Sequence, residues 1–388
     1  MENGFEATLV LSGLLAAGLG ILVAAAALCV GFLALIIFWW REIHRPLALA
    51  RFKENPILEP DPAHWWESEA VFNPAAVYDS GRVHLFYRAL GRDGISRIGY
   101  ASSADGVHFD ERLPYPVYEP GEHARTPDPR RTYAVLSYNT VLWASGGGWG
   151  GVEDPRAVKM DGRTYLSFTV FENWDSGRIG LTSLSLGDLQ EKRWLWKKLA
   201  FLSPPGELHK NWVIFPEKIR GKYAILHSVS PEIRVEYVDS LDEFDEGDRY
   251  ILNSFRGQGG REDSWDAFVR GAGAPPLKTR FGWLLFYHGM HPKEPHIGHK
   301  VGVMLLDLNN PEKVLARSNV PVLEPKEWYE NDWKPGVTYA SGAVVIGEDL
   351  IAYYGGGDKR IAAAKANLRD FVSKLLGGEH AVLEPIKA

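Results

Sequence analysis

The stretch Glu153-Asp154-Pro155-Arg156-Ala157-Val158-Lys159, followed after a glycine turn by Thr164-Tyr165-Leu166-Ser167-Phe168, decides the fold of this chain. A polar loop leads into an alternating strand, and a second strand rich in aromatic residues follows, a pattern typical of a β-hairpin. The same pattern recurs along the chain, most clearly in Val71–Val77 leading to Val83–Arg88, and again from Ile214, Gly273 and Ser341.

The starts of these repeats lie roughly 60 to 80 residues apart, which is room for one four-stranded sheet each. Five repeats predict an all-β protein, a five-bladed β-propeller. Because a ring must leave no sheet edge open, we expect the N-terminal strand to join the last blade. The helical pattern from Leu368 to Leu376 is expected to pack outside the ring.

An apolar segment precedes the repeats. Residues 8–40 contain no charged side chain, and at about 1.5 Å per residue a helix of this length would exceed the hydrocarbon core of a bilayer. The acidic start of the chain argues against a cleaved signal peptide. The cations Arg41, Arg45, Arg51 and Lys53 follow, so the positive-inside rule predicts a cytoplasmic propeller.

The predicted organisation is therefore a transmembrane anchor over residues 1–41, a basic linker over 42–54, and a propeller catalytic domain with a short C-terminal helix over 55–388. The expected location is the membrane, with one span that contacts lipid through residues 8–40 and a cytoplasmic catalytic domain.

Composition narrows the function. A net charge of -6 argues against nucleic acid as a partner, because phosphate backbones require a basic surface. The 14 Trp and 16 Tyr residues fit either rings that stack on sugars or a β-sheet core rich in aromatics. The single cysteine, Cys29, excludes an intrachain disulfide.

Asp154 lies where a loop enters a strand, and a carboxylate there can act as a general acid if its pKa is raised. A turn carrying a surface ion pair with Arg156 is the alternative. However, polar residues recur in every repeat, which favours one shared site at the central channel. They are Asn73, Arg88, Glu153, Asp154, Arg156, Lys210, Asn211, Lys218, Lys278, His288 and Asp358.

Two other patterns carry no prediction of a site. Gly146–Gly151 lacks the Lys-Ser/Thr ending of a phosphate-binding loop and leads into a strand, so no nucleotide is expected. His288, His291, His296 and His299 lie close together in sequence, but the prolines among them indicate an irregular loop, so no metal is predicted.

From Asn55 to about Ala366 the chain resembles glycoside hydrolase family 130, whose five-bladed propellers include β-mannoside phosphorylases and β-1,2-mannosidases. The resemblance rests on motifs that occur in the same order as in the family. They are Phe72-Asn73, Tyr87-Arg88, Gly151–Arg156, His209-Lys210-Asn211, Phe215–Lys218, Gly271–Thr279, Gly282–Gly289 and Tyr353–Asp358.

This resemblance implies the roles of the site residues. Asp154 would be the general acid, acting through a hydroxyl of the mannosyl ring. The other positions would contact substrates, with no cofactor and with inorganic phosphate as co-substrate beside the oligosaccharide. Asn73, Arg88, Glu153, Lys278 and Asp358 would bind the sugar, and Lys210, Asn211 and His288 would bind phosphate.

One departure leaves alternatives open. Ser228 stands where many phosphorylases of the family have an arginine, and Lys210 where arginine is common, although Arg234 could compensate. Inverting phosphorolysis to mannose 1-phosphate needs an acid and a cationic cradle. Inverting hydrolysis needs a second carboxylate about 6.5–9.5 Å away, for which Glu217, Glu232 and Glu153 are candidates. A membrane-tethered sugar-binding propeller without catalysis is a further alternative.

Overall fold

The computed structural model describes residues 26–37, 47–121, 148, 150–173, 176–254, 260–291, 298–377 and 381–382. The chain divides into two compact units, residues 1–46 and residues 47–388. In the first unit, residues 26–37 are helical, and the remainder of the expected membrane anchor lies outside the described residues. Among the residues described, none of the helices has the length and apolar character needed to cross a bilayer.

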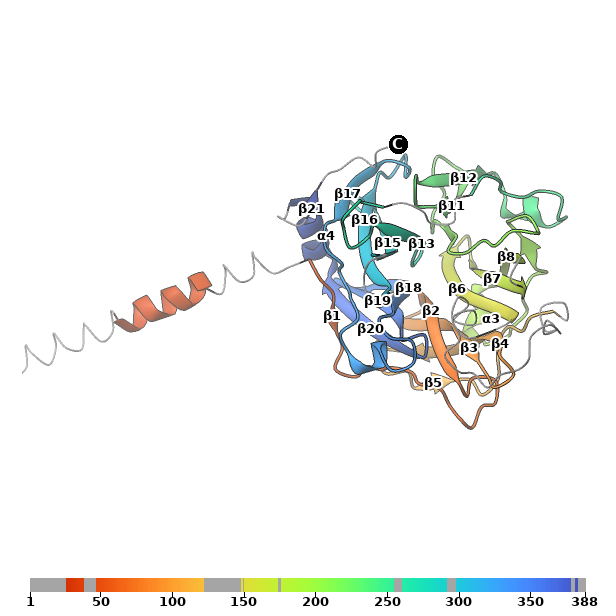
Figure 1. Ribbon diagram of the computed structural model, residues 1–388, viewed down its shortest axis with the longest axis horizontal. Helices are drawn as coiled ribbons and strands as arrows, with labels where there is room; N and C mark the ends of the chain where they lie inside the picture. The colour runs from red at the N-terminus through yellow and green to blue at the C-terminus, as the bar shows by residue number, and fades with distance from the viewer. Residues whose placement is uncertain are drawn as a thin grey trace, which may run out of the picture. The chain divides into compact units, whose positions relative to one another are not determined.

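Residues 47–388 form a ring of five blades, which Figure 1 shows face-on. The first blade consists of β2 (Ala70–Asp79), β3 (Arg82–Leu90), β4 (Ile95–Ser103) and β5 (Glu111–Arg112). The second consists of β6 (Gly150–Met160), β7 (Arg163–Asn173), β8 (Ser176–Ser185) and β9 (Ala200–Phe201), and the third of β10 (Val213–Ile214), β11 (Tyr223–Ser228) and β12 (Arg234–Val238).

The fourth blade consists of β13 (Phe268–Ala272), β14 (Leu277–Thr279), β15 (Gly282–Met290), β16 (Lys300–Leu306), β17 (Val314–Ser318) and β21 (Ala381–Val382). The fifth consists of β18 (Thr338–Ile346), β19 (Asp349–Gly356), β20 (Arg360–Asn367) and β1 (Ala50–Arg51). The short helices are α3 (Leu186–Gln190), η2 (Leu241–Phe244), η3 (Trp328–Glu330) and α4 (Leu368–Gly377). The predicted five-bladed propeller is confirmed.

The first two blades are joined by a short parallel pairing of β4 with β6, in which Ser96 lies opposite Gly151. Gly151 has φ +105°, and an added Cβ would lie 2.2 Å from the carbonyl oxygen of Ser96. Only glycine permits both this backbone conformation and this close approach. Gly151 therefore fixes the start of β6, the strand that carries Glu153 and Asp154.

The ring closes at β1, as the sequence predicts. Ala50 pairs with Lys365 and Arg51 with Ala364, so the N-terminal strand completes the blade built by the C-terminal strands. The predicted linker over residues 42–54 therefore extends too far. Leu47 and Leu49 are already part of the hydrophobic core, because their side chains pack between the last two blades.

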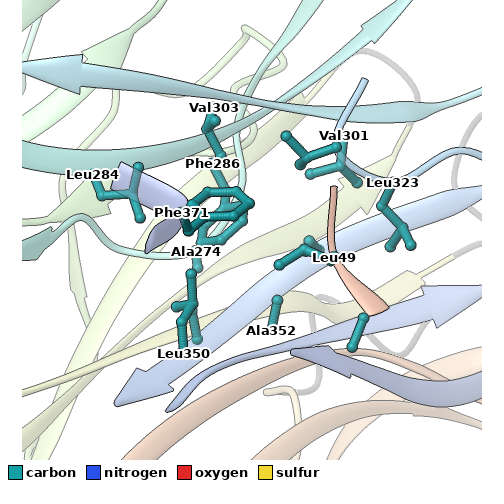
Figure 2. Packing of buried hydrophobic residues seen from close by; sticks show 14 of the residues in the cluster. Leu49, Ala274, Leu284, Phe286, Val301, Val303, Leu323, Leu350, Ala352 and Phe371 are labelled. Atoms are coloured by element: carbon teal, nitrogen blue, oxygen red, sulfur yellow. The ribbon is translucent and has the colours of Figure 1, made fainter. Parts of the chain in front are cut away.

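The core between the fourth and fifth blades shows how the blades adhere (Figure 2). Phe286 and Val303 from one sheet meet Leu350 and Ala352 from the other, and all four side chains are almost fully buried. The helix α4 covers the outer side and buries Phe371 in the same cluster, which confirms its predicted place outside the ring.

A buried acid, tyrosine and arginine recur in three blades. In the first blade the hydroxyl of Tyr87 donates to Glu67 at 2.8 Å, and Arg112 Nη2 lies 2.8 Å from the same carboxylate. The fourth and fifth blades repeat the arrangement with Asp266, Tyr287 and Arg317 and with Glu330, Tyr354 and Arg51. Since each acid is fully buried, its arginine and tyrosine supply the partners that its charge requires.

Candidate active site

The innermost strands of four blades each contain a register irregularity, and those of β2 and β6 lie at corresponding positions of the strand pairing. In β2 it falls between Phe72 and Ala75, in β6 between Glu153 and Arg156, in β13 between Val269 and Gly271, and in β18 between Ala340 and Gly342. A β-bulge leaves its extra residue out of the ladder and redirects the side chain. The residues at these bulges include Asn73, Asp154, Arg270 and Ser341.

Asn73 and Asp154 have φ values of 46° and 53°. Asn and Asp tolerate this left-handed region better than other non-glycine residues, and each is followed by a proline whose missing N–H costs no ladder bond at a bulge. The repeated Asn-Pro and Asp-Pro pairs are therefore the local sequence reason why these two side chains leave the sheet. Both meet at one point, since Asn73 Nδ2 donates to Asp154 Oδ1 at 2.7 Å.

The adjacent carboxylate, Glu153, is completely buried and forms ion pairs with two cations. Arg88 Nη2 donates to its Oε1 at 2.9 Å, and Lys210 Nζ donates to its Oε2 at 2.8 Å. Arg88 is fixed further by a bond of 3.0 Å from its Nε to Ser96 Oγ, and its Nη1 lies 3.5 Å from Asp154. The predicted residues Arg88, Glu153, Asp154 and Lys210 thus lie together.

The charge state of Asp154 follows from these neighbours. Burial pushes the pKa of its carboxyl upward, but the charges of Arg88, Lys210 and Arg156 and the hydrogen bond from Asn73 outweigh burial and lower the pKa to about 2. Asp154 is therefore ionised in the free enzyme at neutral pH. To act as an acid it must gain a proton when substrates bind.

Arg156 and Asn211 connect Asp154 to the rest of the ring. Arg156 donates to the carbonyl oxygens of Gly273 at 2.5 Å and of Asp154 at 3.0 Å. Asn211 precedes β10 with φ 66° and accepts a 2.5 Å hydrogen bond from the hydroxyl of Tyr339. Side chains from the second, third and fifth blades thus converge here.

His288 is fully buried and stacks on Tyr339, with ring centroids 3.7 Å apart. Burial and the charge of Arg156 hold the pKa of His288 well below its usual value. Burial and the charge of Arg270 do the same for His299, whose ring meets Tyr339 edge-on. Both imidazoles are neutral at pH 7, so His288 can offer a hydrogen bond to phosphate but no positive charge.

Asp358 lies in the turn after β19, with φ 52° and its side chain buried, and accepts a 2.9 Å bond from Lys334 Nζ. An added Cβ on Gly355, in the same hairpin, would lie 2.5 Å from Asn73 Oδ1. The charges of both Asp154 and Asp358 act on Tyr339, whose pKa is raised to about 12, mainly by burial. Both aspartates therefore lie close enough to Tyr339 for their charges to act on it, and their shared role in binding a sugar stays a prediction.

Two residues predicted at the site lie elsewhere. Lys218 Nζ lies 3.4 Å from Asp161 Oδ2, in the turn between β6 and β7. Lys278 is the second. It pairs with Trp283 in the β14–β15 hairpin, five residues along β15 from His288, or about 16 Å at ~3.3 Å per residue. Its side chain is half exposed and forms an ion pair with Glu217. The resemblance implies that Lys278 binds the sugar, because it lies in a family motif after Pro275-Pro276. The β14–β15 hairpin instead places its side chain away from the site.

The other candidates for phosphate binding or for a catalytic base are also engaged elsewhere. Arg234, proposed to compensate for Ser228, is bound by Glu232 and by the carbonyl oxygen of Asn253. Ser228 itself donates to the carbonyl oxygen of Glu232 at 2.9 Å. Glu217 and Glu232 are about half exposed and each holds a cation, so neither is free to activate water.

A polar hollow of about 540 Å³ is separate from this site. It lies at the β2–β3 turn around Asp79 and Arg82, beside Gln190 of α3. Asp79 is six residues along β2 from Asn73, or roughly 20 Å. Among the described residues, no cluster of three or more His, Cys, Asp or Glu side chains is arranged to hold a metal ion.

Three residues at the site did not emerge from the sequence. Tyr339 and Arg270 precede the points at which we expected their repeats to begin, Ser341 and Gly273, and Lys334 lies in a loop without strand pattern.

The fold and the site thus define a β-propeller with a buried carboxylate held among cations, a group that can act as an acid on a bound substrate. Sequence comparison supplies the family. The chain belongs to glycoside hydrolase family 130, whose sequence model, described as beta-1,4-mannooligosaccharide phosphorylase, matches residues 48–375.

Individual relatives agree with this assignment. A 1,2-beta-oligomannan phosphorylase of Thermoanaerobacter sp. (strain X514) is 35% identical over 84% of this chain and 99% of its own length. A beta-1,2-mannobiose phosphorylase of Listeria innocua is 30% identical over 72% of this chain and 69% of its own length. The fold is supported by a solved structure of beta-1,2-mannobiose phosphorylase from Listeria innocua in complex with beta-1,2-mannobiose. That structure matches this one with a TM-score of 0.62 at 24% sequence identity. The match covers 84% of this chain and 99% of that chain.

Proposed function

We propose that this protein cleaves β-mannosides by inverting phosphorolysis and releases mannose 1-phosphate, with β-1,2-linked mannosides as the preferred substrates. The linkage is inferred from the relatives, which are named as phosphorylases of β-1,2-linked mannose oligomers. The reaction type is inferred from the site.

The observation that carries the reaction type is the state of the carboxylates. Asp154 is the predicted acid, and its neighbour Glu153 is bound on both oxygens by Arg88 and Lys210. Asp358 is held by Lys334. Inverting hydrolysis requires a carboxylate that can take a proton from water, whereas phosphate already carries the negative charge of a nucleophile. A cationic site with one central acid fits phosphate.

In this proposal phosphate attacks the anomeric carbon from the face opposite the leaving oxygen. The C1–O bond to the leaving sugar breaks as the new C1–O bond to phosphate forms, and the leaving oxygen receives a proton that originates from Asp154. Asn73, Arg88 and Asp358 would hold the mannosyl ring through its hydroxyl groups, with carboxylates accepting and cations or amides donating hydrogen bonds.

The low pKa of Asp154 gives phosphate a second role. Phosphate bound near Arg156 and Lys210 places negative charge next to the same cations that hold the pKa of Asp154 at about 2. Its charge opposes their effect, so the pKa of Asp154 rises when phosphate binds. Binding of the co-substrate phosphate would therefore favour the protonated form of Asp154, which is the form that can act as an acid.

The test is product analysis of the full chain with β-1,2-mannobiose, in the presence and absence of inorganic phosphate. Mannose 1-phosphate formed only with phosphate, and lost in Asp154→Asn, supports the proposal. Free mannose released at the same rate without phosphate would instead indicate hydrolysis. Sugar binding without any turnover in the wild-type protein would indicate a non-catalytic propeller.

We also propose that residues 8–40 anchor the protein in a membrane with the propeller in the cytoplasm. The support is the uncharged sequence of this segment and the cations Arg41 and Arg45 after it. Arg51, another of the cations that follow this segment in the sequence, forms an ion pair with Glu330 inside the propeller. Fractionation of cells that express the full chain tests the anchor. The wild-type protein should stay in the carbonate-washed membrane pellet, and Leu22→Arg combined with Leu33→Arg should release the protein from it. Protease resistance of the propeller in intact spheroplasts tests the orientation.

A further inference from the structure

The polar hollow between the first and second blades has no part in the proposed reaction. Its volume of about 540 Å³ lies within the range of small-molecule binding sites. Asp79 and Arg82 flank the β2–β3 turn of the first blade, whereas Gln190 ends α3, which follows β8 of the second blade. Asp79 lies roughly 20 Å along β2 from Asn73, so a disaccharide bound at Asn73 does not reach the hollow.

The lining of the hollow is polar throughout. Every described residue that lines it carries a side-chain group able to donate or accept a hydrogen bond. Among these residues are the carboxylates Asp79, Asp110 and Glu111 and the cations Arg82 and Lys192. An apolar ligand would leave these groups without partners, which excludes it as an occupant.

The charges of the lining are paired within the protein. Arg82 Nη2 donates to Asp110 Oδ1 at 2.7 Å, and Lys192 forms an ion pair with Glu111. An anion would have to displace a carboxylate from its cation, and a metal ion would have to displace a cation from its carboxylate. In the described part of the chain, no cluster of His, Cys, Asp and Glu is arranged for a metal ion. The lining therefore favours a neutral ligand.

The walls of the hollow are held in place across the boundary between the two blades. Asp79 accepts a 2.8 Å hydrogen bond from Gln190 Nε2 and a 3.1 Å hydrogen bond from Lys159 Nζ, and both donors belong to the second blade. Fixed polar groups need little ordering when a ligand binds, which reduces the entropic cost of binding.

These groups also keep capacity for further hydrogen bonds. A carboxylate has about four lone-pair sites, and Asp110, whose side chain is 65% exposed, uses one of them for Arg82. His84 Nδ1 lies 2.7 Å from the hydroxyl oxygen of Tyr100, and within the described residues His84 Nε2 has no hydrogen-bond partner. The protein's own groups therefore leave the lining of the hollow incompletely satisfied.

We propose that the polar hollow is a second carbohydrate-binding site, which takes a β-1,2-linked mannose disaccharide or one end of a longer chain. A sugar hydroxyl both donates and accepts, so it can bond a carboxylate oxygen and a neighbouring N–H group of an existing ion pair at once. The paired charges and the polar lining indicate a neutral sugar, and the choice of a β-mannoside rests on the proposed function. Because Asp154 lies elsewhere, a sugar bound in the hollow is held without being cleaved.

The experiment counts the molecules of labelled β-1,2-mannobiose that each chain binds at saturation in equilibrium dialysis. All proteins carry Asp154→Asn, which suppresses turnover during the measurement. The parent should bind two molecules per chain. Gln190→Trp, which fills the hollow with an indole from an exposed position, should bind one. Asp110→Ala should weaken the second site by about tenfold, the effect of losing one hydrogen bond to a charged group.

Glu191→Trp is the matched control, because it adds the same indole at the next residue, which is exposed and does not line the hollow. It should still bind two molecules. With Asp154 restored, Gln190→Trp should leave kcat and the KM for mannobiose unchanged, since the active site is intact.

One bound molecule per chain in the parent, or two in a folded Gln190→Trp, overturns the assignment of the hollow. A parent that binds one molecule and changes its oligomeric state with Gln190→Trp would assign the hollow to a contact between copies instead. The proposed function fails separately. Two bound molecules without phosphorolysis in the wild-type enzyme would refute phosphorolysis alone, and one bound molecule with phosphate-dependent turnover would refute the second site alone.

Discussion

Replacement of Asp154 by Asn should strengthen phosphate binding and at the same time greatly slow turnover. The pKa of about 2 means that Asp154 is ionised at pH 7, where its charge opposes an incoming phosphate. Two unit charges about 6 Å apart interact by roughly 3 kcal/mol at an effective dielectric constant of ~20. If salt and solvent remove about half of this energy, the remaining ~1.4 kcal/mol corresponds to about tenfold in affinity.

The fold should tolerate this change, because asparagine has nearly the same shape as aspartate and also accepts the positive φ of 53° at this bulge. Titration calorimetry with inorganic phosphate at pH 7 should therefore show about tenfold tighter binding in Asp154→Asn. Turnover on β-1,2-mannobiose should fall by about 10²–10⁴-fold, the usual contribution of a general acid.

Glu217→Gln is the control for this prediction, since it also removes one negative charge, but at an exposed position away from the site. It should change neither phosphate affinity nor turnover. Weaker phosphate binding in Asp154→Asn, or turnover close to that of the wild type, would refute the proposal that Asp154 is an ionised residue that must be protonated for catalysis.

Three further changes test the structure around the site. Arg51→Ala leaves the fully buried Glu330 without its cation and should lower the free energy of unfolding, measured by urea titration, by about 3–5 kcal/mol. Arg51→Met combined with Glu330→Gln should recover most of this loss. A double variant as unstable as the single one would contradict the reasoning. Burial, helped by Arg234, lowers the pKa of His227 to about 4, so the unfolded state takes up a proton first as the pH falls below 6.5. The wild type should therefore lose up to about 3 kcal/mol relative to His227→Gln between pH 6.5 and 4, and parallel stability curves would show the reasoning to be wrong. Lys334→Met removes the cation 2.9 Å from Asp358 and should raise the KM for mannobiose severalfold without a change in that for phosphate, as separate steady-state titrations would show.

Much of the fold could be predicted because each blade carries the same local signals. The strand pattern around Asp154 recurs with that around Asn73, and the need to close a sheet edge predicts where the N-terminal strand goes. The boundary of the propeller was harder to predict. Leu47 and Leu49 lie among basic residues and resemble a linker in sequence, and only the packing of the last two blades shows that they belong to the core.

The candidate site could be predicted only where a residue is tied to the repeat pattern. Arg88, Glu153 and Lys210 meet as expected, although their roles in substrate binding remain predictions. Lys278 was predicted as a site residue because it lies in the family motif Gly271–Thr279. The direction of its side chain, however, depends on where the β14–β15 hairpin turns. Arg270 gave no signal, because a bulge is a property of strand pairing and does not follow from composition.

The closure of the ring by β1 has a consequence for how the protein is made. The last blade consists of β18, β19 and β20 from the end of the chain and of Ala50–Arg51 from near its beginning. A ribosome must therefore synthesise nearly the whole polypeptide before Arg51 can meet Glu330 and lock the blade. Until β20 has been synthesised, Ala50–Arg51 have no strand to pair with and the ring stays open, so the nascent chain would be most prone to pair with other copies of itself before β20 is made.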